Sequence, residues 1–209
     1  MTSFPASKIY KLQHQINILS GRDSVQCGRE WPSENRRDAC FDYFIAIFSE
    51  VNELMDNFVW KHWAAEAKSG HRWALVDKQN LYVEIADLWL FVTSICQCAG
   101  VTSREYADVC VKLSEGAPRR APGKRIVESA LSLSLAAQFV PDAVAPKDSA
   151  IAVLIALIRL TTLCGISAEQ IAKLYIQKAQ IHKERMLRGR KQHGDTLSEI
   201  ENKRVGIAK

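Results

Sequence analysis

The sequence predicts an all-α protein. Apolar side chains recur with a period of 3.6 residues along most of the 209-residue chain, whereas the alternation that marks strands is hard to find. Glycine and proline gather in a few short breaks between the periodic stretches. With 47% hydrophobic residues, the chain can bury one core of ordinary size. We therefore expect residues 1–209 to form a single domain, a helical bundle of about six to eight helices.

The N-terminal third is expected to hold two helices. Residues 7–19 form the first, because Ile9, Leu12 and Ile16 share one stripe at helical spacing. Residues 20–33 contain two glycines and a proline, so we expect a loop there. A long helical pattern then runs over residues 34–67.

The next helix, expected over residues 78–99, is apolar nearly all round and should therefore be buried. Asp77 is suited to cap its first turn, because its side chain can accept a hydrogen bond from a backbone N–H there. Ser167 and Gln170 form a capping box before the last helix. The four remaining helices are expected over residues 103–116, 124–138, 149–163 and 168–188.

Composition restricts the setting of the protein more than its function. The formal net charge of +5 suits an anionic small molecule as well as nucleic acid. The six cysteines form no C-x-x-C motif, which indicates reduced core thiols in an intracellular protein. The start of the chain lacks the apolar stretch of a secretory signal, and the longest apolar runs are too short to span a membrane. We expect a cytoplasmic protein with no membrane partner.

Two pairs of carboxylates interrupt the apolar pattern: Glu50 with Glu53, and Glu84 with Asp87. Residues three apart share a helix face, so each pair points one way. Ionised carboxylates in a core are unfavourable unless they are paired or bound to metal. Lysine or arginine partners, or solvent at the helix edge, could supply the compensation. Alternatively, antiparallel packing of the two helices would converge four carboxylates into the oxygen-only site that Mg²⁺ favours.

The arrangement resembles a known superfamily. E-x-x-E followed by E-x-x-D on paired helices is typical of the all-α NTP pyrophosphatases, which include MazG, the HisE-type enzymes and the dimeric (type 2) dUTPases. Four segments are similar to motifs of the type 2 dUTPases in particular: "LQHQIN", "ELMDNFVWKHW", "NLYVEIADLWLF" and "YIQKAQIHKERMLRGRK". The resemblance covers residues 12–91 and 175–191, with a trace in "IEN" at 200–202.

The resemblance implies Mg²⁺-dependent hydrolysis of a deoxynucleoside triphosphate, most closely dUTP to dUMP and pyrophosphate, by a homodimer. It implies that Glu50, Glu53, Glu84 and Asp87 are catalytic and hold the metal. Among them, we expect Glu50 to accept a proton from water. The polar composition of the tail, residues 188–209, predicts a mobile segment, which we expect to close over the substrate. The implied substrate-binding residues are Gln13, Asn17, Trp60, Lys61, Asn80, Tyr175, Lys178, His182, Arg185, Lys191 and Asn202.

The residues themselves leave alternatives open. Lys178, His182 and Arg185 share one face of the last helix with Tyr175 and could hold a triphosphate, or they could form a solvated basic helix end. The carboxamides of Gln13 and Asn17 could read a uracil edge or simply be exposed. Trp60 could wall a base pocket or only pack, and Lys61 could contact phosphate or solvent.

Three positions, Leu90, Ala179 and His182, depart from the family pattern and leave the base open. The alternative is therefore a sibling pyrophosphatase acting on dCTP or a non-standard nucleotide. A more distant alternative is a non-catalytic helical binding protein. Nucleic acid is not an expected partner, because a surface that binds it would not gather four carboxylates.

Overall fold

The computed structural model describes residues 4–21, 33–115 and 118–187. These ranges hold seven α-helices, one short π-helical turn and no strand, which confirms the predicted all-α bundle. The elements are α1 (Ala6–Leu19), α3 (Ser33–Asp56), η1 (Ala67–His71), α4 (Lys78–Cys98), α5 (Ser103–Glu115), α6 (Gly123–Gln138), α7 (Pro146–Leu163) and α8 (Ala168–Leu187).

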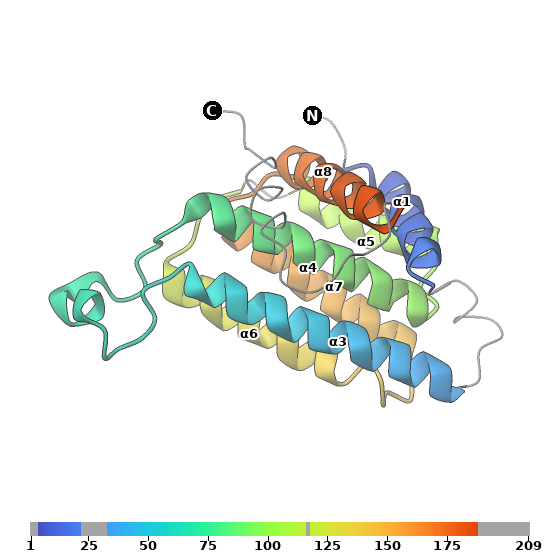
Figure 1. Ribbon diagram of the computed structural model, residues 1–209, viewed down its shortest axis with the longest axis horizontal. Coiled ribbons are helices and arrows are strands. Elements are labelled where there is room, and N and C mark those ends of the chain that lie inside the picture. Colours follow the sequence, from blue (N-terminus) through green and yellow to red (C-terminus); the bar gives the residue numbers. More distant parts are fainter. Residues whose placement is uncertain (1–3, 22–32, 116–117, 188–209) are drawn as a thin grey trace.

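Helix α4 lies at the centre of the bundle. It packs against α3, with which it runs antiparallel, and also contacts α1, α7 and α8 (Figure 1). Helix α6 packs on α3 and α7, while α1 packs on α5 and α8. By length and composition α4 could cross a membrane, but 89% of its most apolar window is buried inside the protein. It is therefore a core helix, as its apolar circumference predicted.

The predicted caps are present. The Asp77 side chain accepts a hydrogen bond from the backbone N–H of Asn80 at 2.9 Å and so begins α4. Ser167 and Gln170 bond each other's backbone N–H groups at 3.2 and 2.9 Å and begin α8. These local signals place both helix starts where the sequence predicted them.

The long helix predicted over residues 34–67 is wrong at its C-terminal end, because α3 stops at Asp56. The Asn57 side chain donates to the carbonyls of Glu53 and Leu54, which ends the last turn. Phe58, which is 4% exposed, turns into the core and forms an antiparallel bridge with Leu75. Residues 57–77 thus leave the bundle as an excursion, visible at one end of Figure 1, and return at α4.

The five cysteines in the described ranges are all free and buried, which agrees with core thiols. They are Cys40, Cys96, Cys98, Cys110 and Cys164. Cys27 lies outside the described residues.

Candidate active site

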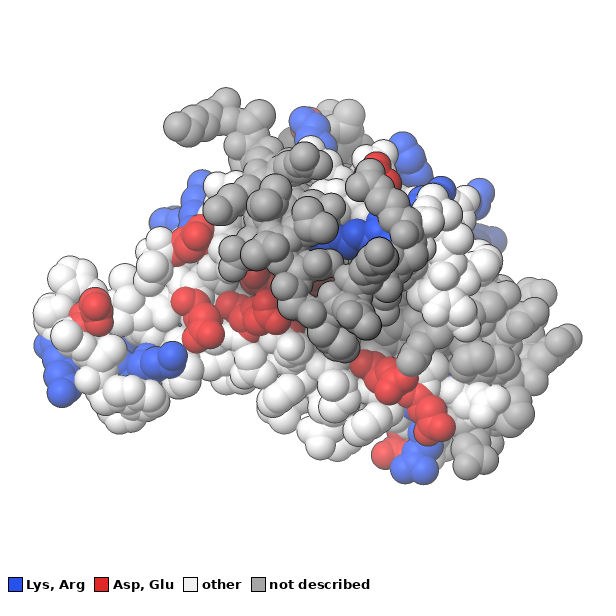
Figure 2. Space-filling model, viewed as in Figure 1, with Lys and Arg blue, Asp and Glu red and all other residues white. Residues whose placement is uncertain are grey.

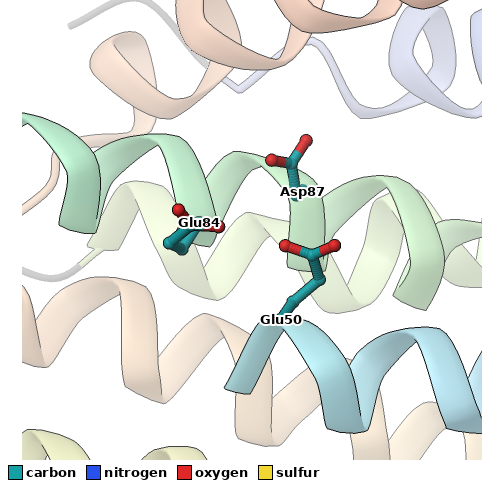
Figure 3. Close-up of side chains that lie close together, drawn as sticks. All are labelled: Glu50, Glu84 and Asp87. Atoms are coloured by element: carbon teal, nitrogen blue, oxygen red, sulfur yellow. The ribbon is translucent and has the colours of Figure 1, made fainter. Parts of the chain in front are cut away.

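The antiparallel packing of α3 on α4 brings three carboxylates together. Ligand oxygens of Glu50, Glu84 and Asp87 all lie within 4.8 Å of one another (Figure 3). Glu84 is buried, whereas Glu50 and Asp87 keep partial exposure. Figure 2 shows acidic side chains gathered along the middle of the face that α3 and α4 present. The cluster could hold a divalent metal ion, whose ligands would all be oxygens.

Burial and mutual repulsion disfavour the ionised form of these three carboxyl groups and raise their pKa values. Burial, followed by the charge of Asp87, raises the pKa of Glu50 to about 10. Burial is also the main cause that raises the pKa of Glu84 to about 7. The pKa of Asp87 is raised by burial too, against the opposing charge of Lys178. Carboxylates this close favour either shared protons or a bound cation, so the donor set fits a divalent metal.

A basic partner reaches the cluster from α8. Lys178 Nζ lies 2.7 Å from Asp87 Oδ2, and both side chains are nearly buried. Arg185 lies near enough to lower the pKa of Asp87. The sequence suggested no local partner for α4, and the partner indeed comes from a distant helix. Lys178 and Arg185 together do not neutralise three carboxylates with Glu53 beside them, so these contacts and a metal site are compatible.

Glu53 lies apart from the three-carboxylate cluster. It is exposed one turn after Glu50, and Ser49 Oγ lies 3.5 Å from its carboxylate. Its charge nevertheless raises the pKa of Glu50, Glu84 and Asp87. Glu53 is therefore close enough to attract a cation but stands at the rim.

A cavity of about 450 Å³ opens over the carboxylates between α1, α3, α4 and α8. The structure thus brings together acidic, amide and basic side chains that lie far apart in the sequence. The predicted site residues that line it are Gln13, Asn17, Glu50, Glu53, Glu84, Asp87, Lys178, His182 and Arg185.

Gln13 and Asn17 are not the exposed pair that the sequence allowed. They are 4% and 2% exposed, and Gln13 Nε2 donates to Asn17 Oδ1 at 3.0 Å. Gln13 Nε2 also donates to Ser94 Oγ at 2.9 Å, while the Tyr175 hydroxyl donates to Gln13 Oε1 at 2.6 Å. Tyr175 is fully buried behind Gln13 and does not line the cavity, so it supports the amide rather than facing the cavity itself.

Three other predicted residues lie away from this cavity. Trp60 Nε1 donates to Asp56 Oδ1 at 3.3 Å, and Lys61 lies 3.9 Å from the same carboxylate. Both border a separate cavity of about 270 Å³, because α3 ends before reaching them. Asn80 donates to Asn57 Oδ1 at 3.0 Å at the base of the excursion. Lys191 and Asn202, like the rest of the tail, lie outside the described residues.

The sequence interpretation missed Tyr43 and Ser94, which line the cavity. A simple signal was available. Tyr43 stands seven residues before Glu50 on α3, and Ser94 stands seven after Asp87 on α4. Seven residues are close to two helical turns, so both extend the carboxylate faces toward α1.

An all-α bundle whose paired helices gather acidic side chains beside a lysine and an arginine has the parts that handle a triphosphate, namely cation ligands and phosphate partners. This arrangement, in a chain of which residues 7–189 match a nucleotide-hydrolase family model, defines an enzyme of the nucleoside triphosphate pyrophosphatase class. The family model described as dUTPase matches residues 7–189, and the chain belongs to this type 2 dUTPase family. The resemblance drawn from the motifs is confirmed. A search of curated proteins found no match.

Proposed function

We propose that the protein hydrolyses dUTP to dUMP and pyrophosphate with Mg²⁺ as its cofactor. Family membership gives nucleoside triphosphate hydrolysis, and the finer assignment rests on one observation. A three-carboxylate cluster shares a single cavity with two basic residues and a pair of carboxamides. A metal site, phosphate partners and base partners are thus within reach of one nucleotide.

The metal would be held by Glu50, Glu84 and Asp87, with Glu53 at the rim. When bound there, Mg²⁺ neutralises phosphate charge and acidifies water. Glu50 faces the α4 pair from α3 and is placed to accept a proton from a water molecule in the cavity. Burial, followed by the charge of Asp87, raises the pKa of Glu50 in the metal-free protein. Glu50 would therefore lose its own proton, and become able to accept one from water, once a bound cation offsets the charge of the cluster.

The basic face of α8 supplies the phosphate partners. Lys178, His182 and Arg185 all line the cavity. Arginine can grip two phosphate oxygens at once, and lysine contributes a compact charge. Lys178 already contacts Asp87, so it would link the cluster to the phosphates. These side chains would offset the charge of the leaving pyrophosphate.

We further propose a homodimer joined through α3 and α6. Phe41, Ile45 and Phe48 are each about half exposed on one stripe of α3. The neighbouring α6 exposes Leu131 and Leu135 at 42% and 60%. Apolar side chains in such number on packed helices are typical of an interface. Phe48→Glu should therefore shift the sedimentation coefficient from dimer to monomer, and a wild-type monomer would refute this interface. A cytoplasmic location stays a prediction.

The central test is a panel of nucleotides. The purified chain should release pyrophosphate from dUTP in Mg²⁺ and not in EDTA, with dUMP as the second product. We expect dCTP, dTTP and UTP to react more slowly. Pyrophosphate release without added metal would refute the metal assignment, and equal rates on dUTP and dCTP would refute the base assignment. No release from any nucleotide would refute the enzyme itself.

A further inference from the structure

The two carboxamides of the cavity belong to a hydrogen-bond chain that begins at a backbone carbonyl. Gln97 of α4 donates its Nε2 to the carbonyl oxygen of Tyr10 at 2.7 Å. A carbonyl oxygen can only accept, so Gln97 must turn its nitrogen toward Tyr10 and its Oε1 away from it. Gln97 is 1% exposed and packed between helices, so it cannot turn over freely.

This constraint passes from Gln97 to Asn17 and then to Gln13. Asn17 Nδ2 donates to Gln97 Oε1 at 3.0 Å, which directs Asn17 Oδ1 toward Gln13. Gln13 Nε2 donates to that oxygen at 3.0 Å, and Gln13 Oε1 then accepts from the Tyr175 hydroxyl at 2.6 Å. Turning over any one carboxamide would set acceptor against acceptor or donor against donor. The three amides are therefore oriented as a unit.

Two hydroxyl groups reinforce the same orientation from neighbouring helices. Tyr43 of α3 donates to Asn17 Oδ1 at 3.3 Å. Ser94 Oγ, on α4, accepts from Gln13 Nε2 at 2.9 Å, and its one proton is shared between the Leu90 carbonyl at 3.0 Å and Asn17 Oδ1 at 3.1 Å. The oxygen of Asn17 thus faces the donors of Gln13 and Tyr43 and shares the proton of Ser94, while its nitrogen meets an acceptor. Burial strengthens the preference, because an unsatisfied amide in this position would be unfavourable.

We propose that Gln97 is a specificity-determining positioning residue, which fixes the hydrogen-bonding edge that Asn17 and Gln13 present to a pyrimidine base. The proposal rests on the proposed function and adds a residue that does not line the cavity. Uracil and cytosine exchange donor and acceptor at N3 and at the position-4 group. A freely turning carboxamide can serve either base, whereas a locked one serves a single base and leaves the other with unpaired groups.

Two substitutions separate the hydrogen bonds of Gln97, which we call the lock, from the packing of its side chain. Gln97→Met keeps the length of the side chain but removes both the donor to Tyr10 and the acceptor for Asn17. Gln97→Glu keeps the acceptor for Asn17 in either protonation state, and its protonated form also donates to Tyr10. The glutamate variant should therefore keep the orientation of Asn17. The methionine variant should release it.

The measurement is the ratio of kcat/KM for dUTP to that for dCTP, with circular dichroism to verify folding. Gln97→Met should lower this ratio at least about tenfold, mainly through the KM values, whereas Gln97→Glu should keep most of it. Thr161→Val is the control, because Thr161 is fully buried and hydrogen-bonded on α7, away from the cavity. An unchanged ratio in Gln97→Met, or an equal loss in both Gln97 variants, would overturn the proposal.

Two further measurements apply if the protein does not turn over these nucleotides or if Gln97→Met does not fold. Calorimetric titration with dUMP and dCMP needs no turnover, so it tests the lock even if the proposed hydrolysis fails. We expect a preference for dUMP that Gln97→Met removes, and no preference in the wild-type protein would overturn the lock. If Gln97→Met does not fold, Tyr43→Phe removes only one donor to Asn17 Oδ1. It should lower the same ratio by a smaller factor, and no change would overturn the proposal.

Discussion

Replacing Glu84 with glutamine should stabilise the metal-free protein and remove its response to Mg²⁺. Glu84 is 4% exposed, and its carboxylate lies within 4.8 Å of those of Glu50 and Asp87. Glutamine keeps the shape of the side chain and removes one negative charge, so repulsion within the cluster falls. The same loss of charge weakens the cluster as a ligand for a hard cation. One substitution thus has two opposite effects.

The magnitude follows from the pKa of Glu84. Burial is the first cause that raises this pKa from 4.5 to about 7. The folded state therefore keeps a proton that the unfolded state loses above pH 4.5. The resulting stabilisation is complete below pH 4.5 and is lost as the pH rises through 7, at about 1.4 kcal/mol per pH unit. At pH 8 the free energy of unfolding is therefore about 3 kcal/mol lower, through Glu84, than below pH 4.5, where this group is protonated in both states.

The assay is thermal or urea unfolding at pH 6 and pH 8.5, in EDTA and in Mg²⁺. Wild-type protein in EDTA should be less stable at pH 8.5, and Glu50, with a pKa of about 10, changes stability in the same direction. Mg²⁺ should restore stability. The effect should be larger at the higher pH, because there the ion has fewer bound protons to displace from the carboxylates. Glu84→Gln should show a weaker pH dependence, little response to Mg²⁺, and turnover reduced by orders of magnitude.

The control is Glu128→Gln, which removes an exposed carboxylate of α6 paired with Lys124. It should leave both the pH dependence and the Mg²⁺ response unchanged. A Glu84→Gln protein that is less stable than wild type at pH 8.5 would show that Glu84 serves a buried ion pair. Normal turnover in that variant would refute the metal site.

Three further predictions concern phosphate, base and fold. Lys178→Ala should lower kcat/KM for dUTP by the equivalent of about 1.5–3 kcal/mol, because it would remove the proposed charge-assisted phosphate contact. Unchanged kinetics would assign α8 a purely structural role. Asn17→Ala should erode the preference for dUTP over dCTP more than it slows dUTP, and a uniform loss on both nucleotides would contradict base reading. Gly123→Ala should lower the free energy of unfolding by about 1–3 kcal/mol in urea. A Cβ at Gly123 would lie 2.1 Å from the Trp73 carbonyl and 2.9 Å from Phe58, so an unaffected variant would mean that the excursion yields easily.

Much of the fold could be predicted because its signals are local. Helix α4 has its cap at Asp77 and its apolar circumference within one short stretch of sequence. The end of α3 could not be found this way, because Phe58 continues the apolar period of the helix. Phe58 leaves the helix and forms a bridge with Leu75, a contact that joins the two ends of the excursion.

In the candidate site too, local spacing could be read from the sequence, whereas contacts between distant helices could not. The spacing of the two acidic pairs predicted that four carboxylates would converge once the two helices were assumed to pack antiparallel. Glu50, Glu84 and Asp87 do converge, whereas Glu53 stays at the rim. The pairing of Asp87 with Lys178 depends on where α8 lies, which periodicity does not specify. The anchor at Gln97 was hidden for another reason, since a single glutamine in an apolar helix gives no pattern.

Helix α4 carries both the acidic pair, Glu84 and Asp87, and the anchoring residue Gln97, so it fixes the distance between them. Asp87 and Ser94 are seven residues apart, so along a helix they are held about 10 Å from each other. In the proposed function, the distance between the metal-binding carboxylates and the base-binding amides would therefore be set by the rise of one helix and not by flexible loops. A nucleotide that is too long cannot be accommodated by adjusting one end. Inserting one residue between Asp87 and Ser94 would shift one relative to the other by about 1.5 Å along the helix and rotate it by about 100°. The carboxylates and the amide-binding face of α4 would then no longer point into the same cavity.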